Sequence, residues 1–208
     1  MEAGSLRRLS LDTNILFDLA DEKDFAHDFR ETYQAKAYAL VICPTVVAEL
    51  YFFHEYGRAE ERRLASITLG RVASWDIQAF ALTGVQLDIA WKFANSILSR
   101  NLLPECEIND ARILGESSVA GIALVVSSDR HLVDMDQDVL RAAFAEADLP
   151  PSFPNEPTTF AAGSSVTGLL TGLDFQVMGA SKRSYRRAGF ARFRIEAGLR
   201  RQPIARRF

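Results

Sequence analysis

Three short, largely apolar runs recur along the sequence, and longer segments whose apolar residues have helical spacing separate them. The runs are residues 9–11, 39–43 and 122–126. They are too short for helices, and buried strands of parallel sheets have continuous apolar sequences of this length. A fourth segment, residues 75–82, fits either an edge strand or an extended connection. Strands that alternate with helices predict an α/β fold, in which helices cover both faces of a mainly parallel sheet.

The segments between these runs contain the signals of helices. Asp12, Thr13 and Asn14 favour a helix start directly after the first run. Residues 44–57 begin with proline and end with glycine, which is typical of a complete helix. The further helices that we expect cover residues 58–73, 85–98 and 109–120, and a short segment after residue 129.

Four carboxylates stand where an apolar run ends or a helix begins. Asp12 and Asp129 follow predicted strands, whereas Glu49 and Asp110 fall in the first turns of predicted helices. A buried, unpaired carboxylate is costly, so something must neutralise each of them. Ligands of open α/β sheets bind beyond the carboxyl ends of the strands, where one site can collect all four. Oxygen ligands of this kind suit Mg²⁺ or Mn²⁺.

Some of these acids also have a structural explanation, although Glu49 is harder to explain in this way. Asp12 and Asp110 could cap the helices that they begin, because aspartate accepts hydrogen bonds from the free amides of a first turn. A first-turn acid such as Glu49 also gains from the helix dipole. Four separate structural reasons would have to coincide, so the sequence favours one shared site over four independent caps.

The residues around the four acids resemble the PIN domain family, the fold of VapC-type toxin ribonucleases. The matching segments are, in order, Leu11-Asp12-Thr13-Asn14-Ile15-Leu16, Val47-Ala48-Glu49-Leu50, Asn109-Asp110-Ala111-Arg112-Ile113-Leu114 and Val126-Ser127-Ser128-Asp129-Arg130. The resemblance covers about residues 8–145, and Ser127 stands where the family more often has threonine. It implies a three-layer α/β/α fold and a metal-dependent nuclease in which Asp12, Glu49, Asp110 and Asp129 form the acidic cluster. The hydroxyl groups of Thr13 or Ser127 would help to orient ligands.

Hydrolysis of RNA phosphodiester bonds fits this set of residues. One or two metal ions held by carboxylates can activate a water and neutralise the developing charge without a histidine or serine nucleophile. Asn14 and Asn109 stand beside the acids in the sequence and could fix the orientation of a water or a carboxylate.

The resemblance further implies an endoribonuclease that is the toxin of a toxin–antitoxin pair. A small antitoxin protein would be its partner and would block the acidic site, and the chain would form a homodimer. The rival hypotheses are a PIN-like module that binds RNA or a protein without cutting, and an RNA-processing or quality-control nuclease.

Charge divides the chain into an acidic body and a basic C-terminal arm. Residues 161–208 contain ten Lys and Arg against two acidic residues, whereas residues 1–160 contain 14 against 25. Four of the seven prolines fall within residues 150–157. The expected organisation is therefore a PIN-like nuclease domain, a stiff linker and a basic C-terminal extension, over residues 1–149, 150–160 and 161–208.

The arm has three possible roles. It could be a charged tail without a fold of its own, or it could place an arginine in the metal site in competition with the cation. It could also contact RNA phosphates, with aromatic residues interleaved for stacking. The arginines assigned to RNA contact are Arg183, Arg186, Arg187, Arg192 and Arg194.

Other features narrow the class of protein. No segment approaches the roughly 20 apolar residues of a membrane helix and none resembles a signal peptide, so we expect a cytoplasmic protein that does not contact a membrane. Cys43 and Cys106 have no partner motif nearby, so both are expected to be reduced and inert. No phosphate-cradling glycine loop is present, which disfavours a nucleotide-driven enzyme.

Two motif-like segments are discounted. Asp134, Asp136 and Asp138 alternate as in a calcium-binding EF-hand loop, but the glycine and the closing glutamate of that loop are missing. Gly115-Glu116-Ser117 is one glycine short of a nucleophile elbow and lies within a predicted helix.

Overall fold

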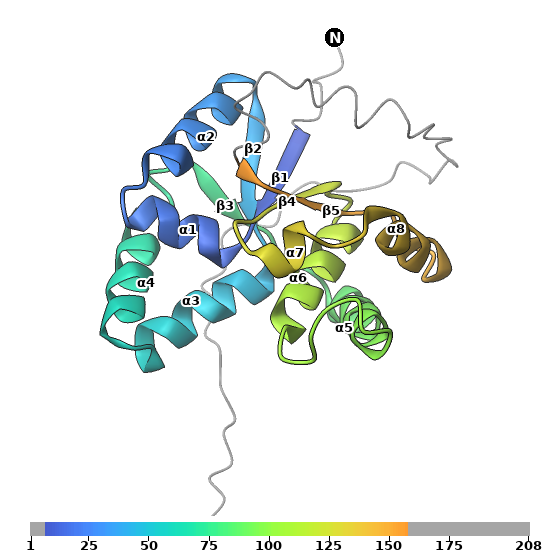
Figure 1. Ribbon diagram of the computed structural model, residues 1–208. Coiled ribbons are helices and arrows are strands. Elements are labelled where there is room, and N and C mark those ends of the chain that lie inside the picture. The colour runs from blue at the N-terminus through green and yellow to red at the C-terminus, as the bar shows by residue number, and fades with distance from the viewer. Residues whose placement is uncertain (1–6, 158–208) are drawn as a thin grey trace, which may run out of the picture. The chain divides into compact units, whose positions relative to one another are not determined.

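The computed structural model describes residues 7–157 of the chain. At its centre is a five-stranded sheet in which all neighbouring strands are parallel (Figure 1). The strands are β1 (Arg7–Leu11), β2 (Tyr38–Ile42), β3 (Ile77–Ala79), β4 (Leu124–Val126) and β5 (Phe153–Asn155). Their spatial order is β3-β2-β1-β4-β5, so the chain starts in the middle and adds strands first on one side and then on the other.

Helices form the outer layers of the fold. They are α1 (Thr13–Ala20), α2 (Asp24–Ala35), α3 (Pro44–Tyr56), α4 (Ala59–Arg71), α5 (Gly84–Ser99), α6 (Ile108–Val119), α7 (Arg130–Val133) and α8 (Gln137–Glu146). Figure 1 shows α1, α2 and α4 on one side of the sheet and α5, α6 and α8 on the other. Helix α3 contacts both α4 and α6. The predicted three-layer α/β/α arrangement with a parallel sheet is thus confirmed. No helix within residues 7–157 is both long enough and apolar enough to cross a membrane.

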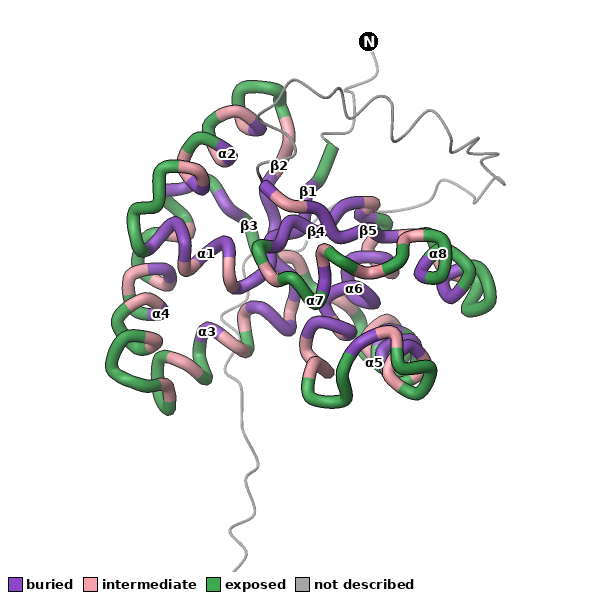
Figure 2. Tube along the Cα trace, in the orientation of Figure 1, coloured by how far each residue is buried: buried purple, intermediate pink, exposed green. Residues whose placement is uncertain are grey.

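The central strands are buried over most of their length, as Figure 2 shows. Leu9, Leu11 and Leu40 are at most 1 % exposed, and all three residues of β4 are buried. Because helices cover both faces, consecutive strand residues must all be apolar or small, rather than alternating with polar ones. This explains why the buried parts of the central strands appear in the sequence as largely apolar runs.

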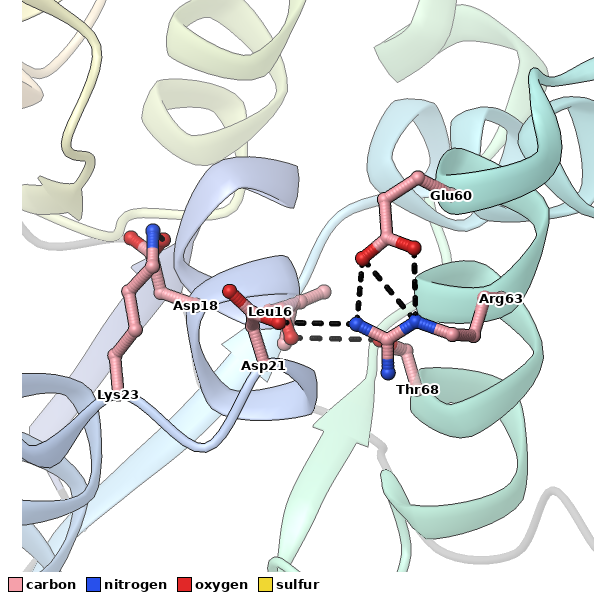
Figure 3. A network of polar contacts seen from close by, with 7 residues as sticks. All are labelled: Leu16, Asp18, Asp21, Lys23, Glu60, Arg63 and Thr68. Atoms are coloured by element: carbon pink, nitrogen blue, oxygen red, sulfur yellow. Dashed lines mark hydrogen bonds and ion pairs between the residues drawn. The ribbon is translucent and has the colours of Figure 1, made fainter.

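Polar contacts tie α1 to α4 (Figure 3). The Nη2 atom of Arg63 donates to Asp21 at 3.0 Å, at the C-terminal cap of α1. The hydroxyl of Thr68, which is fully buried, donates to the backbone carbonyl of Leu16 at 3.4 Å. Since α1 begins with residues of the candidate site described below, these contacts help to fix the site from one side.

Most of the predicted elements are found, with differences of a few residues at their ends. The ambiguous segment contains the short edge strand β3, and the last predicted strand is shorter by two residues at its start. The single helix expected after residue 129 is two helices, α7 and α8, and the sequence interpretation did not include α2.

The proline-rich segment requires a correction, because residues 150–160 were predicted to be a linker. Phe153–Asn155 form β5, which pairs in parallel with β4, and Phe153 is only 4 % exposed. Pro154 can occupy this strand because an edge strand pairs on one side only. The further division into linker and basic extension stays a prediction, since residues 158–208 lie outside the described residues.

Helices α5 and α6 pack closely at Gly115. A Cβ atom at this position would lie 2.8 Å from the backbone carbonyl oxygen of Ala90 in α5. Such a contact is too short for non-bonded atoms, so only glycine fits without a shift of one helix. The segment that resembles a nucleophile elbow in sequence is therefore a helix-packing contact.

Replacing Gly115 with alanine should destabilise the fold by about 1–3 kcal/mol, because the added methyl group forces the helices apart. Thermal unfolding followed by circular dichroism measures the effect. Gly70→Ala in α4 is the matched control, since a Cβ there meets no atom within 4 Å. The control should stabilise the protein by about 0.5–1 kcal/mol. Equal effects of the two substitutions would contradict the close approach of α5 and α6.

Candidate functional site

The candidate site lies at the carboxyl ends of β1 and β4, on either side of the point where the strand order reverses. Asp12 directly follows β1, and its amide donates to the carbonyl of Val126 at 3.0 Å. Ser127 directly follows β4, and its hydroxyl donates to Asp12 Oδ2 at 2.7 Å. Crevices at such reversal points are the usual ligand sites of open α/β sheets.

All four predicted carboxylates line one cavity of about 310 Å³ at this edge. They come from four separate parts of the chain: the end of β1, α3, α6 and the end of β4. No basic side chain within residues 7–157 is among the lining residues of this cavity. The full set is Asp12, Thr13, Asn14, Phe17, Glu49, Phe53, Glu61, Glu107, Asp110 and Asp129. Glu61 and Glu107 are two further acids that the sequence interpretation did not single out.

Asp12 is 2 % exposed and accepts three hydrogen bonds. Its Oδ1 accepts from the amide of Thr13 at 2.6 Å, as expected of a residue that caps α1. Its Oδ2 accepts from Ser127 and, at 3.3 Å, from the side-chain amide of Asn14. The capping role expected as an alternative is therefore present, and it leaves the side chain in the cavity.

Two predicted supporting residues hold Glu49 between α1 and α6. The hydroxyl of Thr13 donates to Oε2 at 2.5 Å, and the side-chain amide of Asn109 donates to Oε1 at 2.7 Å. Together with the contacts of Asn14 and Ser127 to Asp12, every predicted supporting residue touches one of the predicted acids. The sequence interpretation thus placed these neighbours in the same part of the fold.

Asp110 and Asp129 differ in their hydrogen bonding. Asp110 is 8 % exposed, and its buried Oδ2 has no hydrogen-bond partner. Asp129 is half-buried, and its Oδ1 accepts from the amide of His131 at 2.7 Å, which caps α7. Its own amide donates to Ser127 at 2.9 Å. Ser127 therefore connects the acids at the ends of β1 and β4.

Burial raises the pKa values of three of the acids. Burial raises the pKa of Asp110 to about 8, and the charges of Asp12 and Asp129 add to the shift. Burial also raises the pKa of Asp12 to about 6, although its hydrogen bond from Ser127 acts in the opposite direction. The pKa of Glu49 is raised by burial as well. These directions are expected of negative charges that share a cavity without a cation.

The chemistry of the site fits a divalent cation. Its donors are carboxylate and hydroxyl oxygens, which hard cations such as Mg²⁺ and Mn²⁺ prefer, and the unpartnered Oδ2 of Asp110 offers a free ligand atom. Within residues 7–157, the present side-chain conformations do not bring three or more His, Cys, Asp or Glu residues into a group that could hold a metal ion. Metal binding would therefore require some of these side chains to change conformation, although a carboxylate that accepts a hydrogen bond keeps further lone pairs for a cation.

Glu116 of α6 is a buried carboxylate near the site that sequence reasoning did not assign to it. It is 1 % exposed, its Oε2 accepts from the amide of Thr45 at 2.9 Å, and its Oε1 accepts from the hydroxyl of Thr45 at 2.7 Å. Arg112 lies one turn earlier in α6, with Nη2 3.7 Å from Oε1. The signal in the sequence is an acid between small and apolar residues of a predicted helix.

Glu116 takes the place of a local cap for α3. Thr45 is the second residue of that helix, and the N-cap residue, Cys43, forms no side-chain capping bond. A carboxylate at a helix N-terminus satisfies free amides and interacts favourably with the helix dipole. The contact joins the helix that contains Glu49 to the helix that contains Asp110, so it helps to set the distance between the two acids.

We predict that Glu116→Gln lowers the free energy of unfolding by about 1–3 kcal/mol, because only one of the two terminal atoms of glutamine is an acceptor. Thr45→Val should cost less in the Glu116→Gln background than in the wild type, since the hydroxyl bond is already weakened there. Urea unfolding of the four proteins gives the coupling energy. Additive effects of the two substitutions would count against this capping contact.

The stability of the metal-free protein should rise as the pH is lowered from about 8 to about 5. The pKa of Asp110 is raised from 3.8 to about 8 and that of Asp12 from 3.8 to about 6. Within this window the folded state holds protons that the unfolded state has released, so the free energy of unfolding falls as the pH rises. Calorimetry in the presence of a chelator, at constant ionic strength, measures the trend.

Asp110→Asn should raise the melting temperature at pH 8 and flatten this pH dependence, because an amide carries no charge at any pH of the window. The exposed Asp88, replaced by asparagine, is the matched control and should leave both quantities unchanged. A melting temperature of Asp110→Asn below that of the wild type at pH 8 would show that Asp110 contributes a stabilising charge instead.

Chains of two solved structures are similar to this chain. A chain in the crystal structure of VapBC2 from Rickettsia felis, bound to a DNA fragment from its promoter, is 16 % identical with a TM-score of 0.50. The alignment covers 72 % of this chain and 98 % of that one. A chain of VapBC-1 from nontypeable Haemophilus influenzae is 15 % identical over 73 % of this chain and 98 % of its own, with a TM-score of 0.45.

No curated protein sequence matches the chain. The sequence model of the PIN domain matches residues 9–138. The matched segment includes Asp12, Glu49, Asp110 and Asp129, the strands β2, β3 and β4, and the last three residues of β1. The match spans more than half of the 208 residues. The chain belongs to the PIN domain family.

Proposed function

We propose that the chain is an endoribonuclease that hydrolyses RNA phosphodiester bonds with the help of Mg²⁺ or Mn²⁺. The observation that carries this proposal is the convergence of four carboxylates in one cavity that has no basic lining residue within residues 7–157. Structural caps alone do not require such convergence, whereas a cation that binds phosphate does. Membership of the PIN domain family supports the same chemistry.

The residues of the cavity would have separate tasks. Asp12, Glu49, Asp110 and Asp129 would hold the cation. The bound cation would supply the charge that activates a water and neutralises the developing charge on the phosphate. Thr13, Asn14, Asn109 and Ser127 orient two of the carboxylates by the hydrogen bonds described above.

Protons and cations would compete for this cavity. The raised pKa of Asp110, about 8, means that this carboxyl holds a proton near neutral pH when no cation is bound. Cation binding would then release that proton, so the affinity for Mg²⁺ or Mn²⁺ should increase with pH.

A narrower proposal is that the enzyme is the toxin of a toxin–antitoxin pair. The order of the sequence motifs and the similarity in fold to a chain of VapBC2 support it. A small antitoxin protein would then cover the acidic cavity, and a homodimer and a cytoplasmic location belong to the same proposal. Rescue of bacterial growth by co-expression of a short neighbouring reading frame would test the pair.

The part that the basic arm has in this proposal rests on its amino-acid sequence alone. Arg183, Arg186, Arg187, Arg192 and Arg194 lie outside the described residues. Their contact with RNA phosphates stays a prediction.

One observation favours a second candidate function, a PIN domain that binds RNA or a protein without cutting. Within residues 7–157 no group of side chains is arranged to hold a metal ion as it stands. If the carboxylates did not turn toward a cation, the cavity would bind a ligand without hydrolysing it. Cleavage assays distinguish the two candidates directly.

Asp12→Asn should reduce Mg²⁺- or Mn²⁺-dependent cleavage of single-stranded RNA at least about 100-fold, because it removes a charged ligand and leaves a side chain of the same shape. Fluorescently labelled oligonucleotides report the rate, a chelator should stop the wild-type reaction, and circular dichroism should show an unchanged fold. Asp88→Asn is the control and should cleave at the wild-type rate. Full activity of folded Asp12→Asn would disprove its assignment as a ligand, and a wild type inactive with both metals would favour the non-cutting module.

A further inference from the structure

A second cavity, of about 380 Å³, adjoins the acidic cavity and shares Glu49 and Phe53 with it. Helix α3 supplies one wall and α6 the other. The remaining lining residues are Thr45, Ala48, Phe52, Asn109 and Arg112. In contrast to the acidic cavity, this one combines an aromatic surface, a side-chain amide and a positive charge.

Phe52 offers an exposed aromatic ring at the edge of this cavity. Its side chain is 58 % exposed, and its ring centre lies 5.9 Å from that of Phe53 and 5.5 Å from that of Tyr56, which is 73 % exposed. Phe53 in turn contacts Phe17 edge-to-face at 5.4 Å, and both of these residues line the acidic cavity. An aromatic row thus leads from the four carboxylates along α3 into solvent, where the fold itself does not use it.

Arg112 supplies the positive charge opposite this row. Its guanidinium lies over the ring of Trp91 at 5.4 Å, and Nη2 is 3.7 Å from the carboxylate of Glu116. These two contacts hold the guanidinium in place, yet the side chain is still 34 % exposed. A guanidinium fixed in this way suits a phosphate, which it can contact through two N–H groups.

We propose that the second cavity binds the nucleotide next to the scissile phosphate of single-stranded RNA. Its base stacks on Phe52, and its phosphate contacts Arg112. A base can enter only if it is not paired and stacked in a duplex, so the substrate is single-stranded at this position. This inference rests on the proposed endoribonuclease function and adds a binding site for the substrate, which that proposal leaves open.

The shared lining of the two cavities favours RNA over other occupants. A phosphodiester held at the four carboxylates continues directly into the second cavity, because Glu49 and Phe53 belong to both. The occupant must then present an anion near Arg112 and a flat apolar group near Phe52 in adjacent positions. A nucleotide has both within one repeat of the chain, and stacking on an aromatic ring tolerates any base.

The test measures binding rather than cleavage. Full-length protein with Asp12→Asn is titrated with a labelled single-stranded RNA, and fluorescence anisotropy gives the Kd. Adding Phe52→Ala or Phe52→Leu should raise the Kd on the order of tenfold, because each removes the stacking ring. Phe52→Trp should restore binding. Tyr51→Ala is the matched control, since Tyr51 is an exposed aromatic residue of the same helix that lines neither cavity.

A second measurement identifies the base that stacks on the ring. A set of RNAs, each with the base missing at one position, should include one that binds Asp12→Asn about tenfold more weakly. That RNA should lose no further affinity when Phe52→Ala is added, since the stacking partner is already absent.

Three outcomes would overturn the inference. They are no RNA binding, a Kd that Phe52→Ala leaves unchanged, and a loss of binding that occurs only because Phe52→Ala dissociates a homodimer. Light scattering detects the last of these, which would assign the aromatic row to an interface between copies of the chain. The proposed function is judged separately. If the wild-type and Phe52→Ala proteins cleave RNA equally well, the nuclease function stands and this site is wrong. If RNA binding depends on Phe52 but no cleavage occurs, the nuclease function is wrong, and the cavity is an RNA-binding site of a protein that does not cut.

Discussion

The parallel pairing of β1 with β4 is the contact on which the candidate site depends. The strand order reverses at this pair, so the helices that follow the two strands lie on opposite faces of the sheet and a crevice opens between them. Hydrogen bonds from Asp12 to Val126 and from Ser127 to Asp12 join the two strand ends inside this crevice. Helices α3 and α6 then bring Glu49 and Asp110 to the same place.

The fold tolerates a concentration of negative charge that works against its own stability. Burial raises the pKa values of Asp12, Glu49 and Asp110, and the charges of neighbouring cavity acids add to the shifts of Asp12 and Asp110. Asp110 also keeps an unpartnered oxygen. Hydroxyl and amide donors compensate two of these acids only. Sites that sacrifice stability in this way are typically functional, because a ligand supplies the missing interaction. A divalent cation is the ligand that these oxygen donors would bind best.

The surroundings of the acids show how the fold builds a site from helices of different layers. Glu116 holds the N-terminus of α3 against α6, and Gly115 lets α6 approach α5 closely. The same two helices, α3 and α6, form the walls of the second cavity. One set of packing contacts therefore sets both the separation of the carboxylates and the width of the adjoining cavity.

Local patterns in the sequence were enough to predict the α/β class, three of the five strands and a shared place for the four acids at the sheet edge, because apolar runs, helix starts and strand-end acids are local signals. Residues 75–82, which contain β3, fitted either an edge strand or a connection. The pairing of Phe153–Asn155 as β5 is visible in the fold alone, since the prolines of that segment normally indicate a connection and the partner strand β4 is not a neighbour in the sequence. The tertiary structure also revealed the cap that Glu116 provides for Thr45, 71 residues apart, and the cavity shared by α3 and α6. Contacts of this kind depend on how helices pack, which no local pattern of residues encodes.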